Sequence, residues 1–160
     1  MSLESVRAFF AEHAPDIAIL ETDGSSATVT LAAEAFGVEP ARIAKTLSFR
    51  LGERVVLLVT RGDARLDNRK TKAAFGAKPR MLDLDEVVAI TGHPVGGVCP
   101  FGLPTPLPVY CDVSLKVFDE VVPAAGSTQP AVRISPDRMA ALTGAEWVDV
   151  CQEPAALAAQ

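Results

Sequence analysis

Residues 46–61 read TLSFRLGERVVLLVTR, two β-rich runs joined by Gly52 and Glu53. Runs rich in β-branched and aromatic residues, separated by a two-residue connection that contains glycine, predict a β-hairpin. The second run is apolar from Val55 to Val59, which is typical of a strand buried on both faces. The sequence therefore predicts a sheet whose hairpin is covered on both sides.

Capping residues and hydrophobic periodicity predict helices on either side of this hairpin. The expected helices are residues 2–13, 28–36 ending at Gly37, one capped by Asp67 and ending at Gly76, one capped by Asp83 and ending at Gly92, and one capped by Ser135. Further strands are expected at 109–113, 121–124, 131–134 and 146–150. Strands and helices follow no regular βαβ period, which favours a mixed sheet packed with helices over a doubly wound nucleotide fold.

The 160 residues are enough for one domain, expected over 1–151 with a frayed tail at 152–160. A composition that is 49% hydrophobic and 22% charged argues against disorder, and a net charge of −5 argues against coating nucleic acid by bulk charge. No apolar run approaches the roughly 20 residues that a membrane span needs, so we expect a cytoplasmic protein with no membrane partner. The cysteines are Cys99, Cys111 and Cys151, an odd number expected to stay reduced.

Several common chemistries have no support in the sequence. His13 and His93 are the only histidines, and no two cysteines form a CxxC pair, so no metal site is expected. There is no GxSxG elbow, no GxxxxGK[ST] phosphate loop and no GxGxxG fingerprint. We therefore expect no cofactor.

Positive charge is concentrated in residues 61–80, which carry a net charge of +5 while the remaining 140 residues carry −10. The basic residues are Arg61, Arg65, Arg69, Lys70, Lys72, Lys78 and Arg80. A basic element on an acidic chain suits local contact with phosphates, because each neutralised phosphate releases counterions. A solvated helix face would show the same pattern.

Two further features are candidates for chemistry. Lys45 enters the apolar strand TLSF and either extends to solvent or supplies a fixed positive charge to a cleft. The stretch GGVCPFG begins at Gly96 and is either a tight connection or a loop whose backbone N–H groups could hold a carbonyl oxygen. Cys99 within it is a candidate nucleophile, although a small packing residue is the simpler interpretation.

Taken together, the chain resembles the YbaK/EbsC family, the aminoacyl-tRNA deacylase domain that also occurs inserted in bacterial prolyl-tRNA synthetases. The resemblance covers nearly the whole chain. It rests on AKTLSF around Lys45, RGDARLDNRKTKAAFGAK from Arg61, TGHPVGGVCPFG from Thr91, PVYCDVSL from Pro108 and the Ala125-Gly126 turn. It implies an α/β fold of the α+β type, with a mixed, partly barrel-like β-sheet surrounded by helices.

The resemblance also implies an activity, hydrolysis of the ester of a mischarged tRNA, often tRNA(Pro). The essential lysine of the family corresponds to Lys45, which would anchor the terminal adenosine or its phosphate. The family's GxxxP loop corresponds to Gly96, Gly97, Val98, Cys99 and Pro100, whose amides would stabilise the oxyanion of the ester carbonyl. Contacts with the tRNA are expected from Arg61, Arg65, Arg69, Lys70 and Lys72. The implied partners are the acceptor 3′ end of a mischarged tRNA and prolyl-tRNA synthetase.

The sequence departs from the Cys-tRNA(Pro) deacylases of this family at positions near the expected site. Its sole tyrosine is Tyr110, and Ala124 and Ala131 stand where those proteins carry Ser and Asp. The amino acid removed is therefore left open among alanine, serine, threonine, cysteine and others. Two other functions also remain open, a noncatalytic module that binds a tRNA or a synthetase, and a nucleotide-binding protein.

Overall fold

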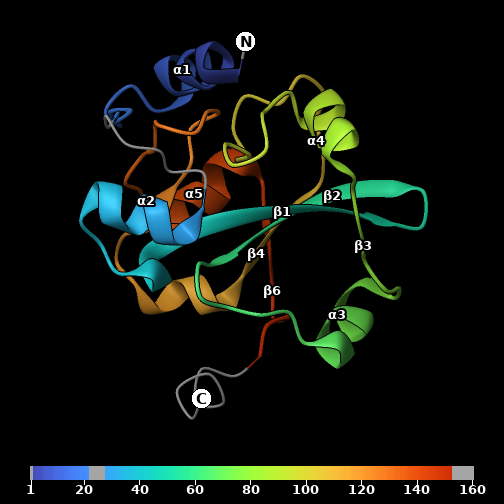
Figure 1. Cartoon of the computed structure of the whole chain (residues 1–160). Helices are drawn as coiled ribbons and strands as arrows, with labels where there is room; N and C mark the ends of the chain where they lie inside the picture. The colour runs from blue at the N-terminus through green and yellow to red at the C-terminus, as the bar shows by residue number, and fades with distance from the viewer. Residues whose placement is uncertain (1, 22–27, 153–160) are drawn as a thin grey trace.

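The computed structural model describes residues 2–21 and 28–152, and its centre is the expected hairpin (Figure 1). Strand β1 (Ile43–Leu51) pairs antiparallel with β2 (Arg54–Arg61) along its whole length. The chain reverses at Gly52, whose positive φ of 65° suits a residue without a Cβ. The hairpin prediction is confirmed, and β1 begins three residues earlier than the β-rich pattern indicated.

Four short strands complete a mixed, open sheet in the order β3-β1-β2-β4-β6, with β5 also pairing with β1. Strands β4 (Val109–Asp112) and β6 (Glu146–Val148) extend the sheet in parallel from β2. Strands β3 (Arg80–Met81) and β5 (Val122–Pro123) both pair with β1. The mixed sheet is confirmed, and the sheet does not close into a barrel.

Five α-helices and two 3-10 helices surround the sheet in the described part of the chain (Figure 1). They are α1 (Ser2–His13), α2 (Val29–Phe36), α3 (Asn68–Phe75), α4 (Leu84–Thr91), α5 (Pro136–Thr143), η1 (Pro40–Arg42) and η2 (Val113–Val117). The predicted caps of α3, α4 and α5 are present, since the side chains of Asp67, Asp83 and Ser135 accept backbone hydrogen bonds in the first turns. Thr28, expected as the first residue of its helix, instead caps α2 in the same way. All five helix predictions are confirmed.

The predicted strand over 131–134 is wrong. Ala131 forms isolated bridges with Leu20 and Ala124, and Ile134 forms one with Val121, but no continuous strand results. Pro123 in the facing segment has no N–H to donate, so a regular ladder cannot form there. The predicted strand over 109–113 stops at Asp112, because the Asp112 carboxylate accepts from the Ser114 N–H at 2.9 Å and starts η2.

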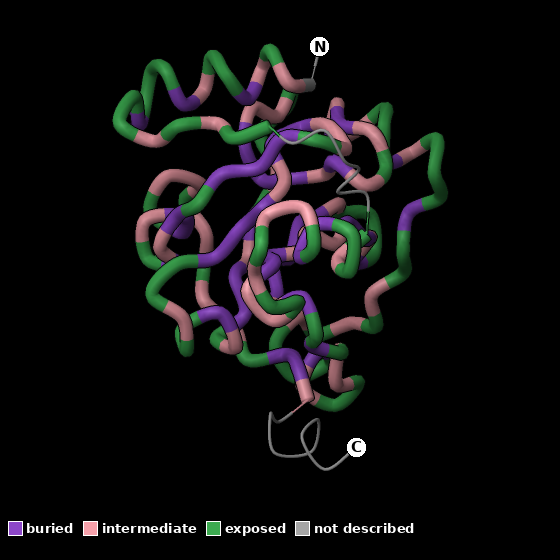
Figure 2. Tube along the Cα trace, turned by 60° about the vertical axis from the view of Figure 1, so that its left-hand side comes forward, coloured by how far each residue is buried: buried purple, intermediate pink, exposed green. Residues whose placement is uncertain are grey.

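The core lies on both faces of the hairpin, as the apolar run in β2 predicted. Leu57 and Val59 face a cluster that includes Phe101 and Met139, whereas Val56 and Leu58 face a second cluster with Phe49. Side chains alternate between the two faces of a strand, so both faces are covered. In Figure 2 the buried segments run through the middle of the molecule, while α1 is largely exposed. The tail residues 153–160 lie outside the described residues.

Candidate functional site

A cavity of about 310 Å³ opens along one edge of β1. Its walls come from α2, β1, the start of α4, the 95–98 loop and the segments around β5. Most of the lining side chains are apolar, including Val29, Ile43, Leu82, Val87, Val98 and Val122. The cavity is therefore suited to a small, largely apolar group.

This cavity exists because one edge of β1 is only partly paired. Strand β5 pairs with Ile43 and Ala44, and β3 pairs with Phe49 and Arg50. Between these two contacts, residues 45–48 have no neighbouring strand on that side in the described part of the chain. A stretch of strand edge is left facing the cavity.

Lys45 lies on this stretch and lines the cavity. Its Nζ donates a hydrogen bond to the Ala64 carbonyl oxygen at 2.7 Å. Burial lowers the pKa of Lys45, and the nearby Cys151 and Asp63 oppose that shift. Of the two positions that the sequence left open for Lys45, the structure has the one at a cleft, with a fixed, half-buried amine at the cavity wall. Its role there stays a prediction.

The 96–100 loop forms the wall opposite β1. Gly96, whose φ is 90°, and Val98 line the cavity. Gly97 is buried and does not line the cavity, and its N–H donates to the Pro94 carbonyl oxygen at 2.9 Å. A Cβ on Gly97 would lie 2.6 Å from the backbone nitrogen of Ser127. Only glycine allows the loop to approach the Ser127 backbone this closely.

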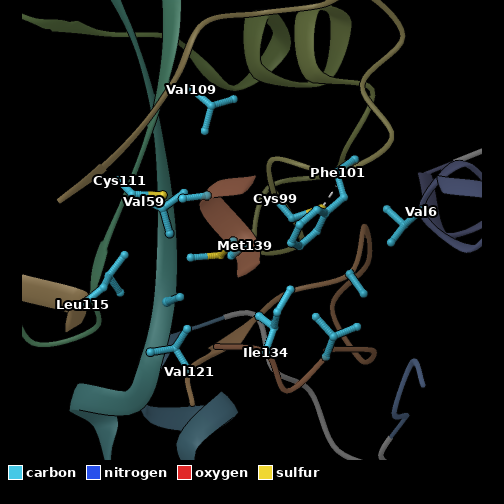
Figure 3. Close-up of a cluster of buried hydrophobic side chains, with 14 of the residues drawn as sticks. Val6, Val59, Cys99, Phe101, Val109, Cys111, Leu115, Val121, Ile134 and Met139 are labelled. Atoms are coloured by element: carbon cyan, nitrogen blue, oxygen red, sulfur yellow. Dashed lines mark hydrogen bonds between the residues drawn. The ribbon is translucent and has the colours of Figure 1, made fainter. Parts of the chain in front are cut away.

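Cys99 and Pro100 are buried behind the loop and do not line the cavity. Figure 3 shows Cys99 beside Phe101 within the hydrophobic cluster. The Cys99 Sγ lies 3.6 Å from Nε2 of His93, and burial raises the pKa of the thiol to about 12. Since the thiolate is the nucleophilic form, this geometry favours a packing role for Cys99.

His93 is fully buried, and its Nε2 lies 2.9 Å from the Phe101 carbonyl oxygen. Its Nδ1 has no hydrogen-bond partner among the described residues. Burial lowers the pKa of His93 from its ordinary value of 6.5. Because the unfolded chain then binds the proton more tightly, stability is fully present above pH 6.5 and lost as the pH falls below it.

We expect the free energy of unfolding to fall by up to about 1.4 kcal/mol per pH unit below that value through His93 alone. Denaturant titrations between pH 7.5 and 5.0 measure this. His93→Gln should remove this part of the pH dependence, and His13→Gln, at an exposed position, should retain it. An identical pH profile for His93→Gln and the wild type would contradict the expectation.

The predicted tRNA-binding residues do not form one free cluster. Arg61 donates twice to the Asp63 carboxylate, at 2.7 Å each. Lys70 donates to Asp149 at 3.0 Å and to the Cys151 carbonyl oxygen at 2.9 Å. These two side chains therefore stabilise the fold. Arg65, Arg69 and Lys72 are exposed around the start of α3 and within it.

Sequence reasoning missed most of the cavity wall. Leu82 and Val87 line it, and no motif marks them. Thr46 also lines it and lies within the AKTLSF motif, but the motif was interpreted through Lys45 alone. Ala124 and Ala131 also line it, and these are the positions where the sequence departs from the Cys-tRNA(Pro) deacylases. That departure was a signal for this part of the wall.

In the described ranges, no three His, Cys, Asp or Glu side chains come together as a metal site. No helix over those same residues has the length and apolar character to span a membrane. The three cysteines are free and buried.

Comparison with known proteins assigns the family. The family model of the aminoacyl-tRNA editing domain matches residues 23–142. The chain belongs to this family. Editing-domain proteins act on aminoacyl-tRNA, which supports a deacylase activity.

Similar proteins agree with the assignment. The chain is 48% identical over 155 residues to the uncharacterized protein YwhH of Bacillus subtilis, covering 96% of this chain and 99% of that protein. It is 30% identical to EbsC of Enterococcus faecalis, provisionally named a Cys-tRNA(Pro)/Cys-tRNA(Cys) deacylase, over 74% of this chain and 73% of that protein. A proline–tRNA ligase of Solidesulfovibrio magneticus is 37% identical over 56% of this chain and 16% of its own length.

A solved structure, provisionally described as a trans-editing enzyme for prolyl-tRNA synthetase, superposes with a TM-score of 0.87 at 33% identity. The match covers 95% of this chain and 98% of that one. The mixed sheet and its surrounding helices are therefore the fold of the editing domain.

Proposed function

We propose that the protein hydrolyses the ester of mischarged tRNA in trans, with tRNA(Pro) carrying a small amino acid as substrate. The observation that carries this proposal is the cavity, which brings Lys45 and the Gly96 loop together in a chain of the editing family. The proposed setting is the cytoplasm, where prolyl-tRNA synthetase produces the substrate.

In the proposed mechanism, the cavity holds the aminoacyl group while Lys45 anchors the terminal adenosine or its phosphate. Because the Gly97 N–H donates to Pro94, the backbone N–H groups of Gly96 and Val98, which line the cavity, are the ones that help to stabilise the oxyanion on the ester carbonyl. A water molecule attacks the carbonyl carbon, assisted by the neighbouring ribose hydroxyl. The bond between the carbonyl carbon and the ribose oxygen then breaks, the ribose oxygen takes up a proton from the attacking water, and the amino acid leaves with a free carboxylate. No thiol is required, in agreement with the raised pKa of Cys99.

The size of the cavity supports a small amino acid. Ala124 and Ala131 present only methyl groups to it, and the remaining wall is mainly aliphatic. Binding alone discriminates one methylene by only about 1–3 kcal/mol, so a synthetase that accepts a small wrong amino acid needs a second, hydrolytic selection. A small, mainly aliphatic cavity suits the selection of a small amino acid for hydrolysis.

Release of labelled amino acid from tRNA(Pro) charged with alanine, serine, threonine or cysteine tests the proposal. We expect release from at least one of the four well above the rate in buffer, and no release from Pro-tRNA(Pro). Tight tRNA binding without any release would instead favour a noncatalytic tRNA- or synthetase-binding module.

The exposed basic residues give a second test. Charge reversal at Arg69 and Lys72 together should raise the KM for mischarged tRNA about tenfold and flatten its salt dependence, because two phosphate contacts are lost. Arg54→Glu combined with Lys78→Glu, at two exposed positions outside the predicted tRNA-binding set, is the matched control because it changes the net charge by the same amount. Steady-state hydrolysis at 50 and 200 mM salt measures both effects. An equal loss in the control would show that only the net charge matters.

A further inference from the structure

Thr46 has a side-chain hydroxyl with no role in the proposed mechanism. Its Oγ1 is buried without a hydrogen-bond partner among the described residues, and the residue lines the cavity. Such groups are rare in folded proteins because an unsatisfied buried hydroxyl is destabilising. The hydroxyl oxygen is enclosed in the cavity wall, and rotation of the Thr46 side chain would bring it to a ligand.

The backbone of Thr46 faces the same cavity. Ser48 accepts a hydrogen bond from the Leu82 N–H on the β3 side of β1. Alternate residues of a strand direct their N–H and C=O groups to the same edge, so those of Thr46 also face this edge. Neither β3 nor β5 reaches Thr46. Thr46 therefore directs an N–H and a C=O to one apolar cavity, with its unpartnered hydroxyl enclosed in the wall beside them.

We infer that Thr46 binds the α-ammonium group of the aminoacyl ester, an inference that rests on the proposed function. An ammonium is a pure hydrogen-bond donor, and the Thr46 C=O and Oγ1 are acceptors. No carboxylate lines the cavity in the described part of the chain, so these two oxygens, with the neighbouring Ser48, are the acceptors at the β1 edge. The remaining N–H of Thr46 is free to hold the ester carbonyl.

The Lys45 ammonium does not prevent the positively charged substrate ammonium from binding at Thr46. Neighbouring side chains on a strand point to opposite faces, and the Lys45 Nζ is held by Ala64 at 2.7 Å. The Thr46 hydroxyl thus lies on the other face of β1. The substrate ammonium and the lysine ammonium are kept apart by the strand itself.

Recognition of the ammonium predicts discrimination against blocked amino groups. An N-acetylated aminoacyl ester has one N–H in place of three, carries no charge and is bulkier. A site built to hydrogen-bond a group rejects analogues that lack it. We therefore expect N-acetyl-aminoacyl-tRNA to be hydrolysed at least about 100-fold more slowly than the matching aminoacyl-tRNA.

The test compares these two substrates, prepared from the same charged tRNA, with the wild type, Thr46→Val and Thr46→Ser. Thr46→Val keeps the side-chain shape without the hydroxyl and should slow aminoacyl-tRNA hydrolysis about tenfold. The ratio of the rates on aminoacyl-tRNA and N-acetyl-aminoacyl-tRNA should therefore fall. Thr46→Ser keeps the hydroxyl and should retain the wild-type ratio. A purely structural role for Thr46 would leave that ratio unchanged.

Equal wild-type rates on the two substrates would overturn the inference while leaving the proposed deacylase function intact. An unchanged substrate ratio in a folded Thr46→Val would also overturn it. If Thr46→Val fails to fold, the wild-type rates on aminoacyl-tRNA and N-acetyl-aminoacyl-tRNA still test the inference. Release from neither substrate would overturn the proposed function itself, and this inference with it.

Discussion

Replacing Lys45 by alanine should lower the rate of mischarged-tRNA hydrolysis by about 100-fold or more, the scale of losing one electrostatic contact in a transition state. The amine is fixed at the cavity wall by a hydrogen bond to Ala64, and among the described residues that line the cavity Lys45 is the only cationic one. Single-turnover release of labelled amino acid measures the loss. Thermal melting should show a folded variant, because the side chain is only half-buried.

Lys78→Ala is the matched control for this substitution, since Lys78 is exposed and lies outside the cavity. It should hydrolyse the same substrate within about twofold of the wild type, as surface substitutions have small effects. Turnover retained by a folded Lys45→Ala would contradict the role assigned to Lys45.

Replacing Gly97 by alanine should have the second largest effect, through the loop. The new Cβ would lie 2.6 Å from the Ser127 backbone nitrogen, and backbone cannot yield as a flexible side chain does. Overpacking of this kind costs about 1–3 kcal/mol. Displacing the loop by even a fraction of an ångström should also slow hydrolysis about tenfold or more, because oxyanion contacts need exact placement.

Gly76→Ala provides the control for Gly97→Ala. A Cβ added to Gly76 would meet nothing within 4 Å, but its φ of 72° strains any residue other than glycine. This variant therefore measures the effect of a destabilising glycine replacement outside the cavity. Its activity should match the wild type even if its melting temperature falls slightly. Wild-type activity in Gly97→Ala would show that the loop does not hold the reacting ester.

Much of the fold could be predicted because its signals are local. The hairpin follows from two β-rich runs around Gly52, and the helices follow from caps such as Asp67 and Asp83. The failed strand at 131–134 depends on the segment opposite it, where Pro123 interrupts the ladder. Nothing within residues 131–134 signals that interruption.

The parts of the site that could be predicted also have local signals, and the parts that were missed depend on segments far apart in the sequence. Lys45 and the Gly96 loop could be found because their motifs are contiguous in the sequence. The cavity could not, since its wall joins segments from Thr28 to Ala131. The open edge at Thr46 depends on where β3 and β5 stop pairing with β1. The charge pattern also could not show which basic side chains are engaged within the fold. Lys70 donates to Asp149, whereas Arg69 is exposed.

In the proposed function, the ester is hydrolysed in the cavity between β1 and the Gly96 loop. The most direct test is single-turnover release from the four mischarged tRNA(Pro) species by the wild type and by Val98→Phe, a substitution that fills the cavity. We predict release of at least one amino acid by the wild type, and its loss in a folded Val98→Phe that still binds tRNA. Undiminished release with the cavity filled, or no release by the wild type from any of the four, would contradict the account.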